Sequence, residues 1–295
     1  MTARSPNTFV VGAGQVAIAL AGALRQAGFP VLGLWARQAA AARSAAALAG
    51  VAGFSPAPPD LLLEAEVVII AVKDDAVGEV ATQLCATGLI GERHVLLHCS
   101  GSTSAATAFA PVLGKVGGVG TLHPLRAIAQ AKDLLRTKGA LRGTVFGIEG
   151  DARGLAAATR IAEILGGTPL LVQGATMARY HAAAAIASNF AVATLDAAVE
   201  LLSSAGVGRD AALAALVPLA QGAIANAGSL GLAGGLTGPI RRGDAGTVQR
   251  HLAAVAHDPE LAQLYRVLGR RTLALAASGL TPEASAAIAA LLAER

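Results

Sequence analysis

The chain has 295 residues, of which 54% are hydrophobic, 14% charged and 3% aromatic. This composition excludes a disordered chain and is sufficient for one large core or two moderate ones. The formal net charge is +4, but the basic residues do not cluster and few aromatic residues accompany them, so we expect no nucleic-acid partner. Two cysteines, Cys85 and Cys99, are too few for a disulfide framework and are typical of a cytoplasmic protein.

The first 173 residues alternate short β-rich runs with alanine-rich helical stretches. Strands are predicted at about residues 8–11, 31–35, 67–72, 94–98, 116–122, 144–148 and 169–172. Helices are predicted between them, notably over 15–27 and 38–49. Alternation of this kind predicts an α/β domain with a doubly wound, mostly parallel Rossmann sheet.

Residues 174–295 have helical periodicity and no clear strand pattern. Helices are predicted over 176–204, 209–227, 244–256, 259–277 and 282–293. We therefore predict two domains, a Rossmann-like domain over 1–173 and an all-α domain over 174–295. The apolar stretches are short or interrupted by polar residues, so no membrane span is expected.

The first predicted strand leads into Gly12-Ala13-Gly14-Gln15-Val16-Ala17, a G-x-G-x-x-A turn that opens a helix. Gly12 permits the tight turn, Gly14 lets backbone amides approach a pyrophosphate, and Ala17 lets helix and strand pack closely. The helix N-terminus, with Gln15 and Val16, completes an anion site. The motif predicts dinucleotide binding; a purely structural turn is the alternative.

The second predicted strand ends just before Arg37. Folds selective for NAD place a carboxylate here, whereas those selective for NADP place an arginine near the 2′-phosphate. The first acidic residue of the chain is Asp60, so Arg37 indicates NADP(H). The alternative is a solvated surface arginine.

Ligands of a doubly wound sheet lie over the carboxyl ends of its strands. Val72 at the third predicted strand and Ser100 after the fourth are candidate cofactor contacts, and Ser100 is also a candidate catalytic residue. His123, after the fifth, is predicted to face the cleft. Asp75 is interpreted as a helix cap.

Three histidines with Cys99 raise the hypothesis of a metal site. No carboxylate or cysteine set completes a ligand shell around His94, His98 and His123, so we expect no metal. His98 is interpreted as a buried, hydrogen-bonded histidine.

The long predicted helix begins with Tyr180-His181 and continues to Ser188-Asn189. On one helix, His181 and Ser188 lie within about 20° of each other, which makes a polar stripe. His181 is the preferred proton donor, because an imidazole can deliver the proton that accompanies hydride addition. Asn189 would orient the substrate, Ser188 would assist, and Tyr180 would contact the substrate; a buried polar network is the equal alternative.

A glycine-rich connector carries Arg241 and Arg242 before Asp244, which is predicted to cap the next helix. Arg241 is a candidate for binding a substrate carboxylate, because a guanidinium grips planar anions at two points. A solvated loop is the alternative.

Taken together, these motifs resemble a group of NADP oxidoreductases related to pyrroline-carboxylate reductase and 6-phosphogluconate dehydrogenase. The group joins a Rossmann-like domain to the domain of unknown function 2520, and its substrate is not settled. The resemblance is carried by the glycine turn and by short motifs, namely His98-Cys99-Ser100-Gly101, His123-Pro124-Leu125, Tyr180-His181-Ala182-Ala183, Ser188-Asn189 and Leu236–Ile240 with Arg242-Gly243-Asp244. It implies an active cleft between two domains and a homodimer built from the helical half.

The sequence thus predicts an NADP(H)-dependent oxidoreductase that acts on a small polar, anionic carbonyl or imine substrate. In the related hydroxyacid dehydrogenases a lysine occupies the catalytic turn where this chain has Arg179, Tyr180 and His181, so their mechanism does not transfer directly. The alternative is a non-catalytic NADPH-binding sensor or partner subunit. A deazaflavin coenzyme stays open within the enzyme class.

Overall fold

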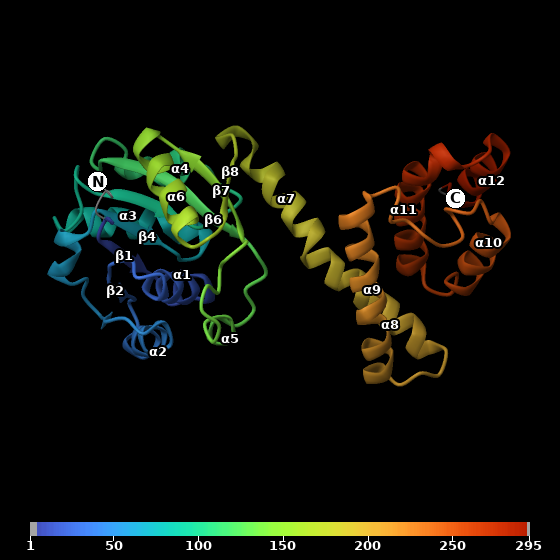
Figure 1. Ribbon diagram of the computed structural model, residues 1–295, viewed down its shortest axis with the longest axis horizontal. Helices are drawn as coiled ribbons and strands as arrows, with labels where there is room; N and C mark the ends of the chain where they lie inside the picture. The colour runs from blue at the N-terminus through green and yellow to red at the C-terminus, as the bar shows by residue number, and fades with distance from the viewer. Residues whose placement is uncertain (1–4, 294–295) are drawn as a thin grey trace. The chain divides into compact units, whose positions relative to one another are not determined.

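The computed structural model describes residues 5–293 and consists of two compact units, divided after Ser188 (Figure 1). The predicted boundary at 173/174 follows the end of the last strand. By contacts, the helix that follows that strand belongs with the first unit.

The first unit contains an eight-stranded sheet of order β3-β2-β1-β4-β5-β6-β7-β8. All neighbouring strands are parallel except β6 and β7, so the predicted mostly parallel, doubly wound sheet is confirmed. The strands are β1 Thr8–Val11, β2 Val31–Trp35, β3 Gly53–Phe54, β4 Val67–Ile70, β5 Val95–His98, β6 Gly118–Leu125, β7 Val145–Gly150 and β8 Thr168–Leu171.

Two details of the sheet differ from the sequence prediction. The two-residue edge strand β3 was not predicted, because it is too short to show a periodicity. β6 extends to Leu125 rather than ending at residue 122, because its last residues pair with antiparallel β7. His123 therefore lies within β6, opposite Gly147, and not in a loop after the strand.

Helices cover both faces of this sheet. The helices of this unit are α1 Gln15–Gln26, α2 Ala39–Ala49, α3 Val77–Ala86, α4 Ala105–Ala108, α5 Ala131–Leu134, α6 Ala152–Ile164 and α7 Met177–Ala187, with short 3₁₀ turns η1 Asp60–Glu64, η2 Asp74–Ala76, η3 Ala110–Val112 and η4 Gly174–Thr176; α7 leads away from the sheet. Val10 of β1 belongs to a core with α1 and α6, whereas its neighbours Phe9 and Val11 belong to a second core with α3. The strands are apolar on both faces because both faces are covered.

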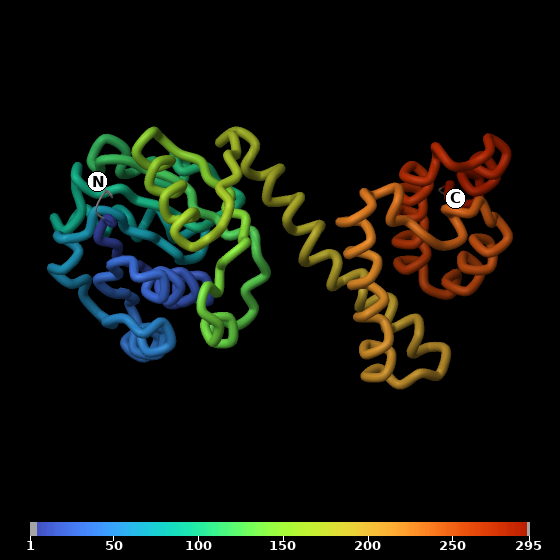
Figure 2. The backbone as a smooth tube through the Cα atoms, viewed as in Figure 1, coloured from blue at the N-terminus to red at the C-terminus, as the bar shows by residue number. Residues whose placement is uncertain are grey.

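The helix predicted over 176–204 is present but is interrupted at Ser188. Figure 2 follows the backbone from the first unit through this stretch. α7 ends at Ala187, and α8, Asn189–Ser204, begins after Ser188, whose φ and ψ are −114° and −72°. The polar stripe predicted from His181 to Asn189 is therefore not carried by one continuous helix.

The second unit is helical, as predicted. Besides α8 it contains α9 Arg209–Leu230, α10 Ala245–Ala254, α11 Pro259–Ala276, η5 Ala277–Gly279 and α12 Pro282–Leu292. A small core joins Ile240 to Val248 and Leu252 of α10 and to Ile288 and Leu292 of α12.

Helices α8 and α9 expose large apolar side chains. The exposed fractions reach 58% at Phe190, 68% at Leu219 and 66% at Ile224. By length and composition alone, the helical stretches Gly174–Ser204 and Arg209–Leu230 are apolar enough to cross a membrane. That criterion is weak evidence, because a surface that packs against another protein chain is equally apolar.

Candidate functional site

The glycine turn joins β1 to α1 at the carboxyl edge of the sheet. Gly12 has φ +124°, and a Cβ there would lie 2.2 Å from the carbonyl oxygen of Ala71. Gly14 is the N-cap of α1, has no side-chain cap and has open space where a Cβ would stand. The first amides of α1 are therefore left for a ligand, as an anion site requires.

A cleft of about 680 Å³ opens at this turn. Its walls include every predicted cofactor residue except Ser100, namely Gly12, Gly14, Gln15, Val16, Arg37 and Val72, together with Trp35, Lys73, Asp74 and Cys99. The N-terminus of α1 has no side-chain cap, and the turn before it leaves no room for a Cβ at Gly12. Both features fit a dinucleotide whose pyrophosphate approaches the bare backbone.

The side chain of Gln15 has a structural task. Its Oε1 accepts a hydrogen bond of 2.7 Å from the amide of Ala131, the first residue of α5. The backbone of Gln15 is therefore left to line the cleft, while its side chain links α5 to α1.

Arg37 lies at the rim of the cleft and is well exposed. Its Nη1 is 3.9 Å from Oε1 of Glu79 on α3, and the two side chains are 65% and 60% exposed. An exposed pair of this length is weak, so the guanidinium stays available to a phosphate.

Asp74 lies four residues after the end of β4, at the start of η2, and was not predicted as a site residue. Its Oδ2 accepts hydrogen bonds from Ser100 Oγ at 2.7 Å and from Ser102 Oγ at 2.9 Å. Ser100 also accepts from the amide of Ser102, so its proton is committed to Asp74. The available signal was its position after a strand end. The neighbouring Asp75, interpreted as a helix cap, lies within η2 and caps no helix among residues 5–293.

A row of buried polar side chains crosses the sheet beside this cluster. Ser100 N donates to Nδ1 of His98 at 3.1 Å, which places the His98 proton on Nε2, facing Thr121 Oγ1 at 2.9 Å. Thr121 in turn donates to Glu149 Oε2, which also accepts from the amide of Ala105. The interpretation of His98 as a buried, hydrogen-bonded histidine is confirmed, and the row anchors both ends of the 99–104 loop.

A second cluster contains His123, Tyr180 and His181. His123 Nδ1 and the Tyr180 hydroxyl are 2.8 Å apart, and the two histidine rings meet edge to face with centroids 5.7 Å apart. Gly101 lies against both imidazoles, because a Cβ there would be 2.8 Å from His181 Nδ1 and 2.9 Å from His123 Nε2. Glycine is thus the residue that lets the two rings come together.

Burial determines the protonation of this cluster. Burial, reinforced by nearby His181 and opposed by the charge of Asp74, lowers the pKa of His123 to about 4. Burial raises the pKa of Tyr180, and a backbone hydrogen bond with Gly147 opposes it. At neutral pH the pair is therefore a neutral phenol and a neutral imidazole. Such a pair can form hydrogen bonds with a polar substrate while neither side chain carries a charge.

The remaining predicted site residues lie elsewhere in the chain. Ser188 is the exposed C-cap of α7, and Asn189 and Arg241 belong to the second unit. There, Arg241 packs on Gly279, and Asp244 caps α10 as predicted.

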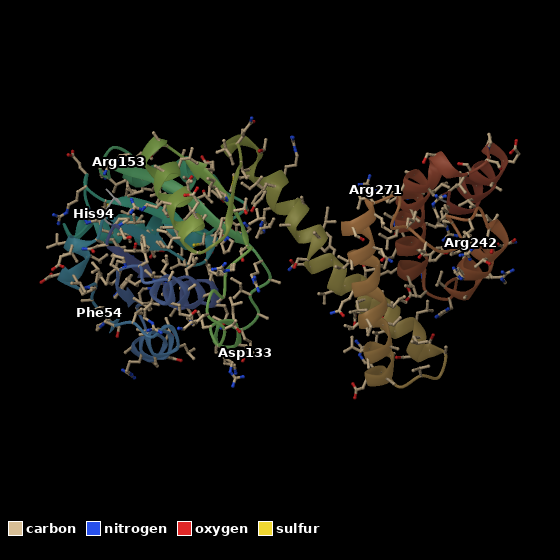
Figure 3. The ribbon with its side chains drawn as sticks, viewed as in Figure 1. Phe54, His94, Asp133, Arg153, Arg242 and Arg271 are labelled. Carbon is tan, nitrogen blue, oxygen red and sulfur yellow. The ribbon has the colours of Figure 1, made fainter. Side chains whose placement is uncertain are left out.

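The histidines do not assemble a metal site. His94, labelled in Figure 3, precedes β5 and bonds the backbone of Gly91 and Leu62. His98 is the last residue of the same strand. Within residues 5–293, no group of three or more His, Cys, Asp or Glu side chains is placed to hold a metal ion.

The buried histidines predict an acid-sensitive first unit. The pKa of His98 is also lowered to about 4 by burial, whereas both histidines titrate near 6.5 when unfolded. Unfolding therefore takes up protons between pH 6.5 and 4, so stability is complete above pH 6.5 and falls by up to about 3 kcal/mol per histidine toward pH 4. Urea unfolding at several pH values measures this, and His98→Gln should reduce the slope; an unchanged slope would contradict the assignment to His98.

The fold and the cleft define a doubly wound domain with a dinucleotide-type glycine turn, followed by a helical unit. Comparison with family models agrees: residues 3–124 match the Rossmann-like domain, and residues 144–272 match the domain of unknown function DUF2520. The first part of the chain is thus similar to a Rossmann-like domain and the second part to DUF2520, as the resemblance implies. No match was found among curated proteins.

Solved structures share the fold over nearly the whole chain. A Thermotoga maritima protein is 26% identical with a TM-score of 0.71, covering 92% of this chain and 99% of its own. A reductive aminase of Aspergillus terreus, in complex with NADPH and ethyl-5-oxohexanoate, is 19% identical with a TM-score of 0.57, covering 98% of this chain and 93% of its own. A pyrroline-5-carboxylate reductase of Coxiella burnetii is 16% identical with a TM-score of 0.61, covering 98% and 99%.

Proposed function

We propose that the protein is an NADP(H)-dependent oxidoreductase that moves a hydride to or from a small polar carbonyl or imine substrate. The observation that carries the proposal is the cleft at the glycine turn, with neutral hydrogen-bonding groups and a carboxylate at the neighbouring strand ends. The similar folds of a reductive aminase and a pyrroline-5-carboxylate reductase support the same class of reaction.

NADP(H) is the proposed cofactor. Gly12, Gly14 and the amides of the first turn of α1 would hold the pyrophosphate, and Arg37 would bind the 2′-phosphate in place of Glu79. The bound cofactor supplies the hydride; the protein supplies position and electrostatics.

The chain's own groups would hold the substrate and move the proton. His181 is the proposed proton donor, because its exposed imidazole adjoins the buried His123. His123 and Tyr180 would hold the reacting oxygen or nitrogen, and Ser100 would act by holding Asp74.

Three further roles remain proposals from the sequence. Asn189 and Ser188 would orient the substrate, and Arg241 would bind a substrate carboxylate.

The test is NADPH oxidation over a panel of carbonyl and imine substrates with wild type and His181→Ala. We expect turnover to fall by about 100-fold with an unchanged Kd for NADPH, because His181 would act on the proton and not on the cofactor. The exposed His257, whose Nδ1 lies 3.1 Å from the carbonyl oxygen of Ala254 at the end of α10, provides the control variant His257→Ala. Unchanged turnover in His181→Ala would remove this residue from the mechanism, and NADPH binding without turnover of any substrate would favour a sensor.

We also propose that the protein is a cytoplasmic homodimer, assembled through the helical unit. The exposed apolar side chains of α8 and α9 supply the surface, and the free thiols of Cys85 and Cys99 suit a reducing compartment.

A further inference from the structure

The Asp74 carboxylate is held in a fixed orientation at the wall of the dinucleotide cleft. Both of its hydrogen bonds, from Ser100 and Ser102, reach the same oxygen, Oδ2. Ser100 is itself only 7% exposed and is tied through its amide to buried His98. The carboxylate is therefore positioned by the sheet and not by its own flexible side chain.

This carboxylate has no counterion in the described part of the chain. Ion pairs between residues 5 and 293 join Arg37 to Glu79, Arg136 to Asp133 and Arg209 to Asp196. Neighbouring Lys73 lines the same cleft but forms no ion pair with Asp74. Across these residues, Oδ1 also has no hydrogen-bond partner, so an exposed carboxylate with one free oxygen borders the cleft.

Asp74 lies beside the groups proposed to act on the substrate. The loop Ser100-Gly101-Ser102 bonds Asp74 through its two serines, and its glycine contacts His123 and His181. The charge of Asp74 also acts on His98 and His123, where it opposes the effect of burial on the pKa. The loop Ser100-Gly101-Ser102 thus lies between the Asp74 carboxylate, which has no ion-pair partner among residues 5–293, and the neutral imidazole of His123.

We propose that Asp74 binds a positively charged nitrogen of the substrate, so that the substrate class is a protonated imine in one direction and the corresponding amine in the other. This inference rests on the proposed function and deepens it. A fixed carboxylate attracts a protonated nitrogen and forms a charge-assisted hydrogen bond with it.

The reaction balances with this assignment. The hydride from NADPH adds to the carbon of the protonated C=N bond, and the π electron pair moves to nitrogen, which keeps its proton. The carbon is reduced and the nicotinamide is oxidised. The product is a neutral amine, which takes a proton from His181, the proposed donor, and becomes the ammonium ion that Asp74 also binds.

The test measures binding, separately from turnover. Calorimetry with the NADP⁺-loaded protein would compare cyclohexylammonium with cyclohexanol and cyclohexanecarboxylate, which have the same ring and different charge. We expect wild type to prefer cyclohexylammonium, and Asp74→Asn to weaken its binding about tenfold while the Kd for NADPH stays unchanged. Asp75→Asn is the matched control, because it removes the same charge one residue away.

Several outcomes would overturn the inference. They are equal binding of cyclohexylammonium in wild type and Asp74→Asn, an equal loss in Asp75→Asn, a preference for the carboxylate, or a loss of NADPH binding in Asp74→Asn. The last would assign Asp74 to the cofactor. Failure of the proposed function would give a different result: the wild-type protein would not bind NADPH at all.

Discussion

Gly12→Ala is expected to abolish binding of both NADPH and NADH. The added Cβ would meet the Ala71 carbonyl oxygen at 2.2 Å, and the residue would have to adopt φ +124°. A non-glycine residue in such a conformation costs about 1–3 kcal/mol, and the backbone of β4 cannot move aside without disturbing the centre of the sheet. The turn must therefore shift, which moves the amides of α1 away from the pyrophosphate.

Fluorescence titration with both dinucleotides measures this effect, and urea unfolding gives the accompanying loss of stability. Gly91→Ala is the control, since Gly91 has ordinary φ and open space around it. Arg37→Ala provides the contrast: we expect it to weaken NADPH and leave NADH nearly unchanged. Tight NADPH binding by Gly12→Ala would show that the turn is only structural, and stronger NADH than NADPH binding by wild type would overturn the role of Arg37.

Ile224→Glu is expected to convert a wild-type dimer into a monomer. Ile224 is 66% exposed on α9, among other large apolar side chains of α8 and α9. Burying a leucine- or isoleucine-sized side chain stabilises by about 1.5–3 kcal/mol, and a glutamate forced into the same interface adds the cost of desolvating a charge. Because a symmetric dimer uses the same surface of both subunits, the substitution places two glutamates in one interface.

Analytical ultracentrifugation over a range of concentrations measures the oligomeric state. Leu113→Glu is the matched control, because Leu113 is 47% exposed in the first unit and should tolerate the charge. A monomeric wild type would contradict the dimer. Sedimentation of the wild type with phosphatidylcholine vesicles would instead indicate that α8 and α9 contact a membrane.

The strands and the glycine turn were predictable because their signals are local. β1 and β2 match their predicted ranges, and the turn at Gly12 and Gly14 has the backbone that its motif requires. The break at Ser188 was missed, since alanine on both sides predicts an uninterrupted helix. His123 was placed after its strand because the antiparallel pairing with β7, which lengthens β6, involves residues far away in the sequence.

By itself, the sequence determined the doubly wound domain, the helical domain and the dinucleotide motif, because periodicity and turn chemistry are properties of neighbouring residues. Only the tertiary structure decided which polar groups meet. Asp74 joins Ser100 and Ser102, and His123 joins Tyr180, across separations of 26, 28 and 57 residues. Such partners are set by strand order and burial, which no local pattern encodes.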